Sequence, residues 1–203
     1  YGLIAFASSL DQIGPITRNV YENAVVLNTI CGKSDKDLTS VETNEDFTRL
    51  IGEKIDGMKI AIPKFYISDA ISSEIKDKLN DVVSLLKENG CSIDYVDIKY
   101  IDKAVPLYQI IAMGEASSNL ARFDGIRYGY SYENPENIDD LYLQTRQEGF
   151  GEEVKRRIMV GSYLLSGENA KTYYNKALSI RDDIRKEFKK CFEKYDLIIG
   201  PTT

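Results

Sequence analysis

The chain has 203 residues, of which 43% are hydrophobic, as is typical of a globular protein with one domain or two. It contains no histidine, which excludes Ser-His-Asp and Cys-His catalysis and the usual imidazole zinc sites. The net charge is −6, whereas a protein that binds nucleic acid directly is usually basic, with its Lys and Arg on one face.

The N-terminal part predicts one helix between two irregular stretches. Residues 1–17 mix small and apolar side chains and end in a Gly-Pro pair, which indicates a short extended piece and then a turn, with Asp11 fixing its own backbone. The Asn-Val-Tyr-Glu sequence that starts at Asn19 is a variant capping box, and predicts a helix to about Cys31. Residues 33–45 are polar and unpatterned, and predict a mobile surface loop.

A strand–helix–strand unit should follow. Apolar residues alternate over 58–62, which is the period of a strand, and then recur at helical spacing over 75–86. Ser72 or Ser73 should cap this helix and a glycine should end it. A second strand should begin at Ile93, and a unit of this length usually closes as a right-handed parallel crossover.

The rest of the chain predicts mostly helix. A helix over 107–123 should lead into a turn at Asp124-Gly125 and then into a tyrosine-rich loop. The pattern beyond this loop predicts three helices and a short buried strand, near 138–147, 151–165, 169–194 and 197–199.

The three cysteines indicate structure rather than chemistry. Cys31, Cys91 and Cys191 are far apart and odd in number, and no Cys-x-x-Cys spacing suggests a disulfide framework or a metal site. They predict a reducing compartment, which we take to be the cytoplasm. Cys191 shares the apolar face of the last helix, so it should act as a small buried hydrophobe. No apolar run is long enough to cross a bilayer, and we expect no membrane contact.

Four stretches carry a family signature. They are SLDQIGPITR at 9–18, GEASSNLARFDGIRYG at 114–129, EGFGEEVKRRI at 148–158 and YDLIIGPT at 195–202. On composition alone, the second would be a helix end followed by an ordered loop. The first and last resemble stretches found in looser form across the amidase-signature family. The middle two resemble, more specifically, the A subunit of the tRNA-dependent amidotransferase, and the resemblance covers nearly the whole chain.

This resemblance implies an α/β fold, with a mixed sheet flanked by helices, that forms an incomplete amidase-signature fold. Residues 1–203 would be the central portion of a single amidase-signature domain, lacking the upstream catalytic segment and the downstream C-terminal portion. Family members use a serine nucleophile, a second serine and a lysine, and the resemblance places all three upstream. The chain would then contain no catalytic residue and would be inactive alone.

The resemblance also implies a function. The intact subunit would hydrolyse glutamine and supply ammonia for converting Glu-tRNA(Gln) to Gln-tRNA(Gln) in translation, as part of a carbon–nitrogen ligase. A B subunit would use ATP and Mg, contact most of the tRNA and receive the ammonia, and a small C subunit would complete a heterotrimer. No cofactor or metal is expected in this chain, which has no Walker-type phosphate loop. The sequence leaves open a preference for Asp-tRNA(Asn).

Two residues are candidates for binding the substrate. Lys155, Arg156 and Arg157 form a basic cluster, which on a helix is usually a solvated face. On the helical wheel Arg157 flanks the apolar stripe and can lean inward, whereas Arg156 should face water. The resemblance implies that Arg157 binds the α-carboxylate of glutamine and that Tyr108 contributes to the same pocket. Tyr108 could instead be an interior aromatic with a bonded hydroxyl.

Glu115 and Asp124 could pass for an acid–base pair, but pairing with Arg122 or Arg127 is the expected role. Several serines could pass for nucleophiles, but the chain has no histidine to activate them. These are serines 8, 9, 117 and 118. A lysine whose pKa is depressed by burial could act as the base instead. Two other functions stay open, namely hydrolysis of a different amide and a non-catalytic interaction module of the same fold.

Overall fold

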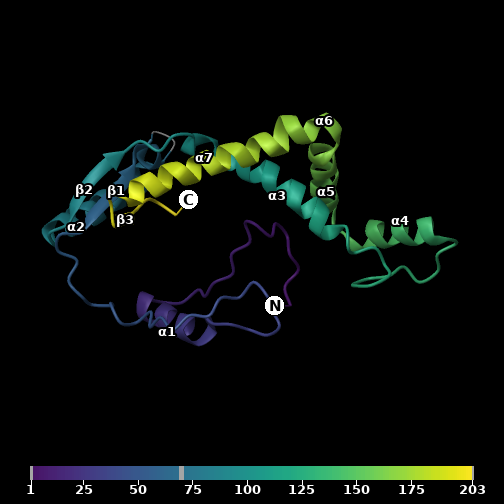
Figure 1. The fold of residues 1–203 in the computed structure, drawn as a ribbon, viewed down its shortest axis with the longest axis horizontal. Coiled ribbons are helices and arrows are strands. Elements are labelled where there is room, and N and C mark those ends of the chain that lie inside the picture. The colour runs from purple at the N-terminus through teal and green to yellow at the C-terminus, as the bar shows by residue number, and fades with distance from the viewer. Residues whose placement is uncertain (1, 69–70, 203) are drawn as a thin grey trace. The chain divides into compact units, whose positions relative to one another are not determined.

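The computed structural model describes residues 2–68 and 71–202, and the chain divides into two compact units. The first contains Gln12–Asp56 together with the residues before Ala5. The second contains Ala5–Asp11 and the chain from Gly57 onward. Figure 1 labels the helices and strands of both units. That residues 1–203 are one portion of a single domain stays a prediction.

The first unit is built around helix α1 (Val20–Ile30). The side chain of Asn19 caps it by accepting a hydrogen bond of 2.8 Å from the backbone N–H three residues further on, as the capping box predicts. The side chain of Asn28 accepts a hydrogen bond of 2.8 Å from the backbone N–H of Phe47, which ties the chain after residues 33–45 to the helix. Residues 33–45 form turns and one isolated bridge, so the expected loop is confirmed, while its mobility stays a prediction.

The second unit contains a three-stranded sheet of β1 (Lys59–Pro63), β2 (Ser92–Val96) and β3 (Leu197–Ile198), in the order β2-β1-β3. Helix α2 (Ser73–Glu88) connects β1 to β2, and the side chain of Ser72 caps it. This is the predicted strand–helix–strand unit. The central strand β1 is buried over four of its five residues, and a partner strand pairs with each of its edges.

All strand pairings among the described residues are parallel. Ile60 of β1 lies opposite Ile93 of β2 on one side and Leu197 of β3 on the other. The α/β class and the helix-flanked sheet are confirmed, but the described strands do not form the mixed sheet that we expected. The reason is connectivity: a helix precedes both outer strands and returns the chain to the same end of the sheet each time.

The remaining helices begin with α3 (Ala104–Leu120), which crosses α5 (Glu152–Leu165) and also contacts α7 (Asn175–Phe192). Helix α4 (Ile138–Gly149) precedes α5, and the short α6 (Gly167–Asn169) follows it. Figure 1 shows α3 and α7 running beside each other away from the sheet. Two short 3₁₀ helices complete the unit, η1 (Lys64–Ile67) and η2 (Ile101–Lys103).

Helices α3 and α5 pack closely at Gly161. A Cβ on Gly161 would lie 2.0 Å from the carbonyl oxygen of Met113 and 2.6 Å from the Cβ of Ser117, so only glycine fits. The hydroxyls of Ser117 and Ser162 share a hydrogen bond of 2.9 Å across the same crossing. These contacts fix the spacing of the two helices that line the candidate site.

The helix predicted over 169–194 is interrupted at its start. Residues Ala170–Tyr174 form a π-helical turn, η3, and α7 begins only after it. A π turn carries one residue more than an α turn and so rotates the side chains around it. Here it accompanies close packing of the Tyr174 ring on Gly114 of α3, where an added Cβ would lie 2.8 Å from the ring. The spacing of apolar residues over 169–194 does not indicate this interruption.

The core of the second unit has two clusters. Ala61, Ile98 and Cys191 are buried where α7 meets the sheet, and burial raises the pKa of the Cys191 thiol. The prediction that Cys191 is a small buried hydrophobe is therefore confirmed. The other cluster lies where α3 meets α7 and consists of Leu107, Ile111 and Ala177. It holds the N-terminal half of α3, which carries one of the two candidate binding residues.

Candidate functional site

A small cavity of about 130 Å³ is enclosed by α3, α5 and the segment Ala5–Asp11. It brings together the two candidate binding residues, which are 49 positions apart in the sequence (157 − 108). The full lining is Phe6, Tyr108, Gln109, Ala112, Met113, Arg156 and Arg157. The cavity thus combines two guanidinium groups, one phenol and several apolar surfaces.

Arg157 lies at the margin of this cavity, with 38% of its side chain exposed. Its Nε donates a hydrogen bond of 2.7 Å to Oε1 of Glu153, one turn earlier on α5. Its guanidinium carbon lies 5.2 Å from the centroid of the Phe6 ring, within range of a cation–π contact. The inward lean expected from the helical wheel is thereby confirmed, while a role in binding glutamine stays a prediction.

Arg156 is more exposed than Arg157, at 57% of its side chain, in agreement with the wheel. The helical wheel places Arg156 nearly opposite the apolar stripe, and so did not predict that its side chain reaches the cavity. Arg156 curls back to Glu153, with hydrogen bonds of 2.8 Å from Nε and 2.7 Å from Nη2, and so also lines the cavity. A long flexible side chain reaches places that its Cβ direction does not indicate.

Tyr108 projects from α3 into the same cavity and is 50% exposed. Tyr108 is therefore not the buried interior aromatic that was considered as an alternative. Within residues 2–68 and 71–202, the hydroxyl of Tyr108 has no protein hydrogen-bond partner, so it can serve a bound molecule. Whether Tyr108 contributes to substrate binding stays a prediction.

Glu153 is the residue that sequence reasoning missed. The two hydrogen bonds from Arg156, and then the one from Arg157, lower the pKa of its carboxyl to about 2. The signal was present in the Glu-Glu-Val-Lys-Arg-Arg run, where Glu153 precedes the two arginines by three and four residues. Such spacing is common on solvated helices, and nothing in the sequence set this pair apart.

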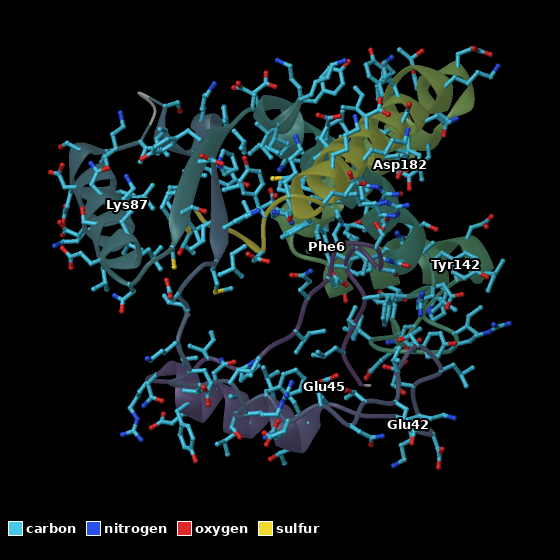
Figure 2. All side chains as sticks on the ribbon, turned by 60° about the vertical axis from the view of Figure 1, so that its left-hand side comes forward. Phe6, Glu42, Glu45, Lys87, Tyr142 and Asp182 are labelled. Atoms are coloured by element: carbon cyan, nitrogen blue, oxygen red, sulfur yellow. The ribbon has the colours of Figure 1, made fainter. Side chains whose placement is uncertain are left out.

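The segment Ala5–Asp11 brings Phe6 to the cavity by hydrogen bonding. Asp11 accepts hydrogen bonds from the backbone N–H of Phe6 at 2.9 Å and of Ala7 at 3.1 Å, so its expected role in fixing its own backbone is confirmed. Asn119 of α3 donates to the carbonyl of Phe6 at 3.1 Å. Figure 2, which labels Phe6, shows this segment beside the helices of the second unit.

Glu115 holds the same segment, and the ion pairs expected for it and for Asp124 are wrong. Glu115 accepts hydrogen bonds from the backbone N–H of Ser9, at 2.9 Å, and from its hydroxyl. Asp124 instead accepts from the backbone N–H of Ile126 at 2.9 Å and so fixes its own turn. Arg122 donates to a backbone carbonyl at the end of α3. These charged side chains bond backbone and hydroxyl groups instead of pairing with one another. The spacing of charges along the sequence does not show which of these partners is preferred.

Three of the four serines considered as nucleophiles, Ser8, Ser9 and Ser117, form hydrogen bonds through their hydroxyls. The hydroxyl of Ser8 accepts a hydrogen bond of 3.0 Å from Asn119, and Ser9 bonds Glu115. Ser117 bonds Ser162 between α3 and α5.

None of the helices in the described part of the chain is long and apolar enough to cross a membrane.

Known proteins share this sequence and fold. The amidase family profile matches residues 1–203. The chain is 49% identical to the A subunit of the glutamyl-tRNA(Gln) amidotransferase of Macrococcus caseolyticus and 51% identical to that of Streptococcus gordonii. Each alignment covers 100% of this chain and 42% of the relative, so the chain spans less than half the length of these relatives.

Solved structures agree. The crystal structure of the glutamyl-tRNA(Gln) amidotransferase A subunit from Thermotoga maritima is 36% identical and superimposes with a TM-score of 0.74. The match covers 100% of this chain and 39% of that protein. A bacterial aryl acylamidase of the amidase-signature family, at 21% identity, shares the fold with a TM-score of 0.69 over 93% of this chain and 36% of its own. The resemblance inferred from the four sequence stretches is confirmed, and the match along the whole chain shows that it belongs to the amidase family.

Proposed function

We propose that this chain is part of the glutaminase subunit of a tRNA-dependent amidotransferase. The observation that carries the proposal is the identity of 49–51% to A subunits along the whole chain. In the intact subunit the side-chain amide of glutamine acylates a serine and ammonia leaves. Water then hydrolyses the acyl-enzyme to release glutamate, and the ammonia is used to convert Glu-tRNA(Gln) to Gln-tRNA(Gln).

The cavity between α3 and α5 supports this proposal chemically. The planar guanidinium of Arg157 suits a carboxylate, which it can bind through two parallel hydrogen bonds. The hydroxyl of Tyr108 can donate a further bond or accept one. The charged guanidinium and the phenol hydroxyl suit the carboxylate of an amino acid better than an apolar aryl or fatty group. In this role the chain binds and orients glutamine, while the reacting hydroxyl comes from elsewhere in the subunit.

The remaining parts of the proposal concern partners and location. A B subunit binds ATP, Mg and most of the tRNA, and a C subunit completes the heterotrimer, which works in the cytoplasm. The net charge of −6 supports a division of labour in which another subunit contacts the polyanionic tRNA.

The direct test uses the full-length subunit purified with its partner subunits. Given glutamine, ATP, Mg and misacylated Glu-tRNA(Gln), the complex should form Gln-tRNA(Gln) and release glutamate. Running Asp-tRNA(Asn) in parallel identifies the preferred tRNA. Activity on simple aryl or fatty amides but none on glutamine would instead favour the other amide hydrolase. No turnover of any amide would favour the interaction module.

We also expect residues 1–203, purified alone, to release no glutamate from glutamine. The expectation rests on the family resemblance, which implies that the serine–serine–lysine set lies outside these residues. Within them, the hydroxyls of Ser8, Ser9 and Ser117 are bonded to Asn119, Glu115 and Ser162. A coupled glutamate dehydrogenase assay measures this, and the full-length subunit serves for the positive control. Turnover that co-purifies with the 203-residue chain through two independent columns would contradict the expectation.

A further inference from the structure

The guanidinium of Arg157 is held on two sides. Its Nε donates to Oε1 of Glu153 at 2.7 Å, and its guanidinium carbon lies over the Phe6 ring, 5.2 Å from the centroid. Among the described residues, neither terminal nitrogen of Arg157 has a protein hydrogen-bond partner. The group therefore keeps available the two Nη atoms, the edge with which it can bind a carboxylate.

Glu153 is itself held firmly. Oε1 accepts from Arg156 Nη2 and from Arg157 Nε, each at 2.7 Å, and Oε2 accepts from Arg156 Nε at 2.8 Å. The other ion pair found on the described helix α5 is simpler: Lys155 makes a single contact of 2.9 Å with Glu152. Glu153 also remains ionised at any working pH, because its two arginines lower its pKa to about 2.

We propose that Glu153 is a positioning residue for substrate binding, which holds Arg157 so that its two terminal nitrogens face the α-carboxylate of an amino-acid substrate. This inference rests on the function proposed above. Arg156 acts through Glu153, because it neutralises the carboxylate and fixes its orientation. An arginine side chain is flexible, and holding it in place before the substrate arrives removes part of the entropic cost of binding.

The proposal and simple electrostatics predict opposite changes in the KM for glutamine when the charge of Glu153 is removed. Glu153 is an anion beside a site for an anionic group, so its charge alone should weaken binding, and its removal should lower the KM for glutamine. If Glu153 instead holds Arg157 in place, its removal should raise the KM. Releasing one ordered side chain corresponds to roughly 3- to 10-fold in affinity. We expect a rise of this size for Glu153→Gln, with a smaller change in kcat.

The chain offers a matched control. Glu152 lies in the same turn of α5 and also pairs with a basic side chain, but its partner is Lys155 and it does not line the cavity. Glu152→Gln removes the same charge at the same helix end, and it should leave the KM for glutamine within about 2-fold of the wild type. Both variants lose surface ion pairs, so their thermal unfolding should change little, and unfolding curves check this.

The experiment is a double-mutant cycle in the full-length subunit with its partners, measuring steady-state glutaminase kinetics. Its variants are Glu153→Gln, Arg157→Ala and the pair. The proposal expects Glu153→Gln to raise the KM in the wild type and to have no further effect once Arg157 is alanine. An unchanged or lower KM in Glu153→Gln, or equal effects in both backgrounds, overturns it. If Arg157→Ala itself leaves the KM unchanged, the substrate pocket of the proposed function fails too, so the two failures are distinguishable.

Discussion

Replacing Arg157 with alanine in the full-length subunit should raise the KM for glutamine by about 30- to 150-fold. The substitution removes two charge-assisted hydrogen bonds to the substrate carboxylate, worth roughly 2–3 kcal/mol together, and each 1.4 kcal/mol corresponds to a factor of ten. The carboxylate stays away from the reacting bond and is bound alike in the ground and transition states, so kcat should fall much less than kcat/KM. Steady-state glutamate release measures both constants.

Lys155→Ala is the matched control for this prediction. It removes the same unit charge from the same turn of α5, but Lys155 pairs with Glu152 and does not line the cavity. Its KM should stay near that of the wild type, because its partner Glu152 is largely exposed and such an ion pair is worth little. If Arg157→Ala and Lys155→Ala shift the KM equally, the effect is general electrostatics and Arg157 does not bind the substrate directly.

Gly161→Ala should destabilise the full-length subunit by about 2–3 kcal/mol, the upper range for overpacking a well-packed interior. The added methyl would meet the carbonyl oxygen of Met113 at 2.0 Å, and backbone atoms cannot move aside as a side-chain tip can. Helices α3 and α5 must separate, which also moves Arg157 away from Tyr108 and should raise the KM for glutamine. The A subunits that this chain resembles are more than twice its length, so the midpoint of thermal unfolding should fall by only about 2–3 °C.

Gly151→Ala provides the comparison. Gly151 precedes α5 with φ of −68°, which any residue adopts, and a Cβ there meets no atom within 4 Å. Gly151 is also the N-cap of α5, where alanine is less favourable than glycine, so this variant should unfold within about 1 °C of the wild type, with an unchanged KM. Equal stability of the two variants would contradict the close crossing of α3 and α5.

Local patterns in the sequence predicted most elements, because local interactions determine them. Asn19 caps α1, Ser72 caps α2, and the alternation around Ile60 marks the buried strand β1. The two candidate binding residues came from the family resemblance, and the cavity that they share depends on the crossing of α3 and α5. Gly161 makes that crossing possible, yet a lone glycine within a helix does not reveal which atom will approach it.

What the sequence could not predict depends on long-range contacts. Phe6 reaches the cavity because Asn119, more than a hundred residues away, bonds its carbonyl. Glu115 bonds Ser9 across a similar separation, instead of a nearby arginine. The parallel direction of β3 depends on where α7 ends, which its amphipathic pattern does not specify. In each case the partner is fixed by packing of distant segments, about which spacing along the chain carries no information.

The two-residue strand β3 has a consequence for how the chain folds during synthesis. Asp196, just before β3, bonds the backbone N–H of Lys59 at 2.8 Å across 137 positions, and β3 covers the second edge of β1. At a translation rate of 5–20 residues per second, the ribosome needs roughly 7–27 s to make the intervening stretch. For that time the apolar strand around Ile60 keeps an open edge, the kind of surface through which nascent chains aggregate and which chaperones shield.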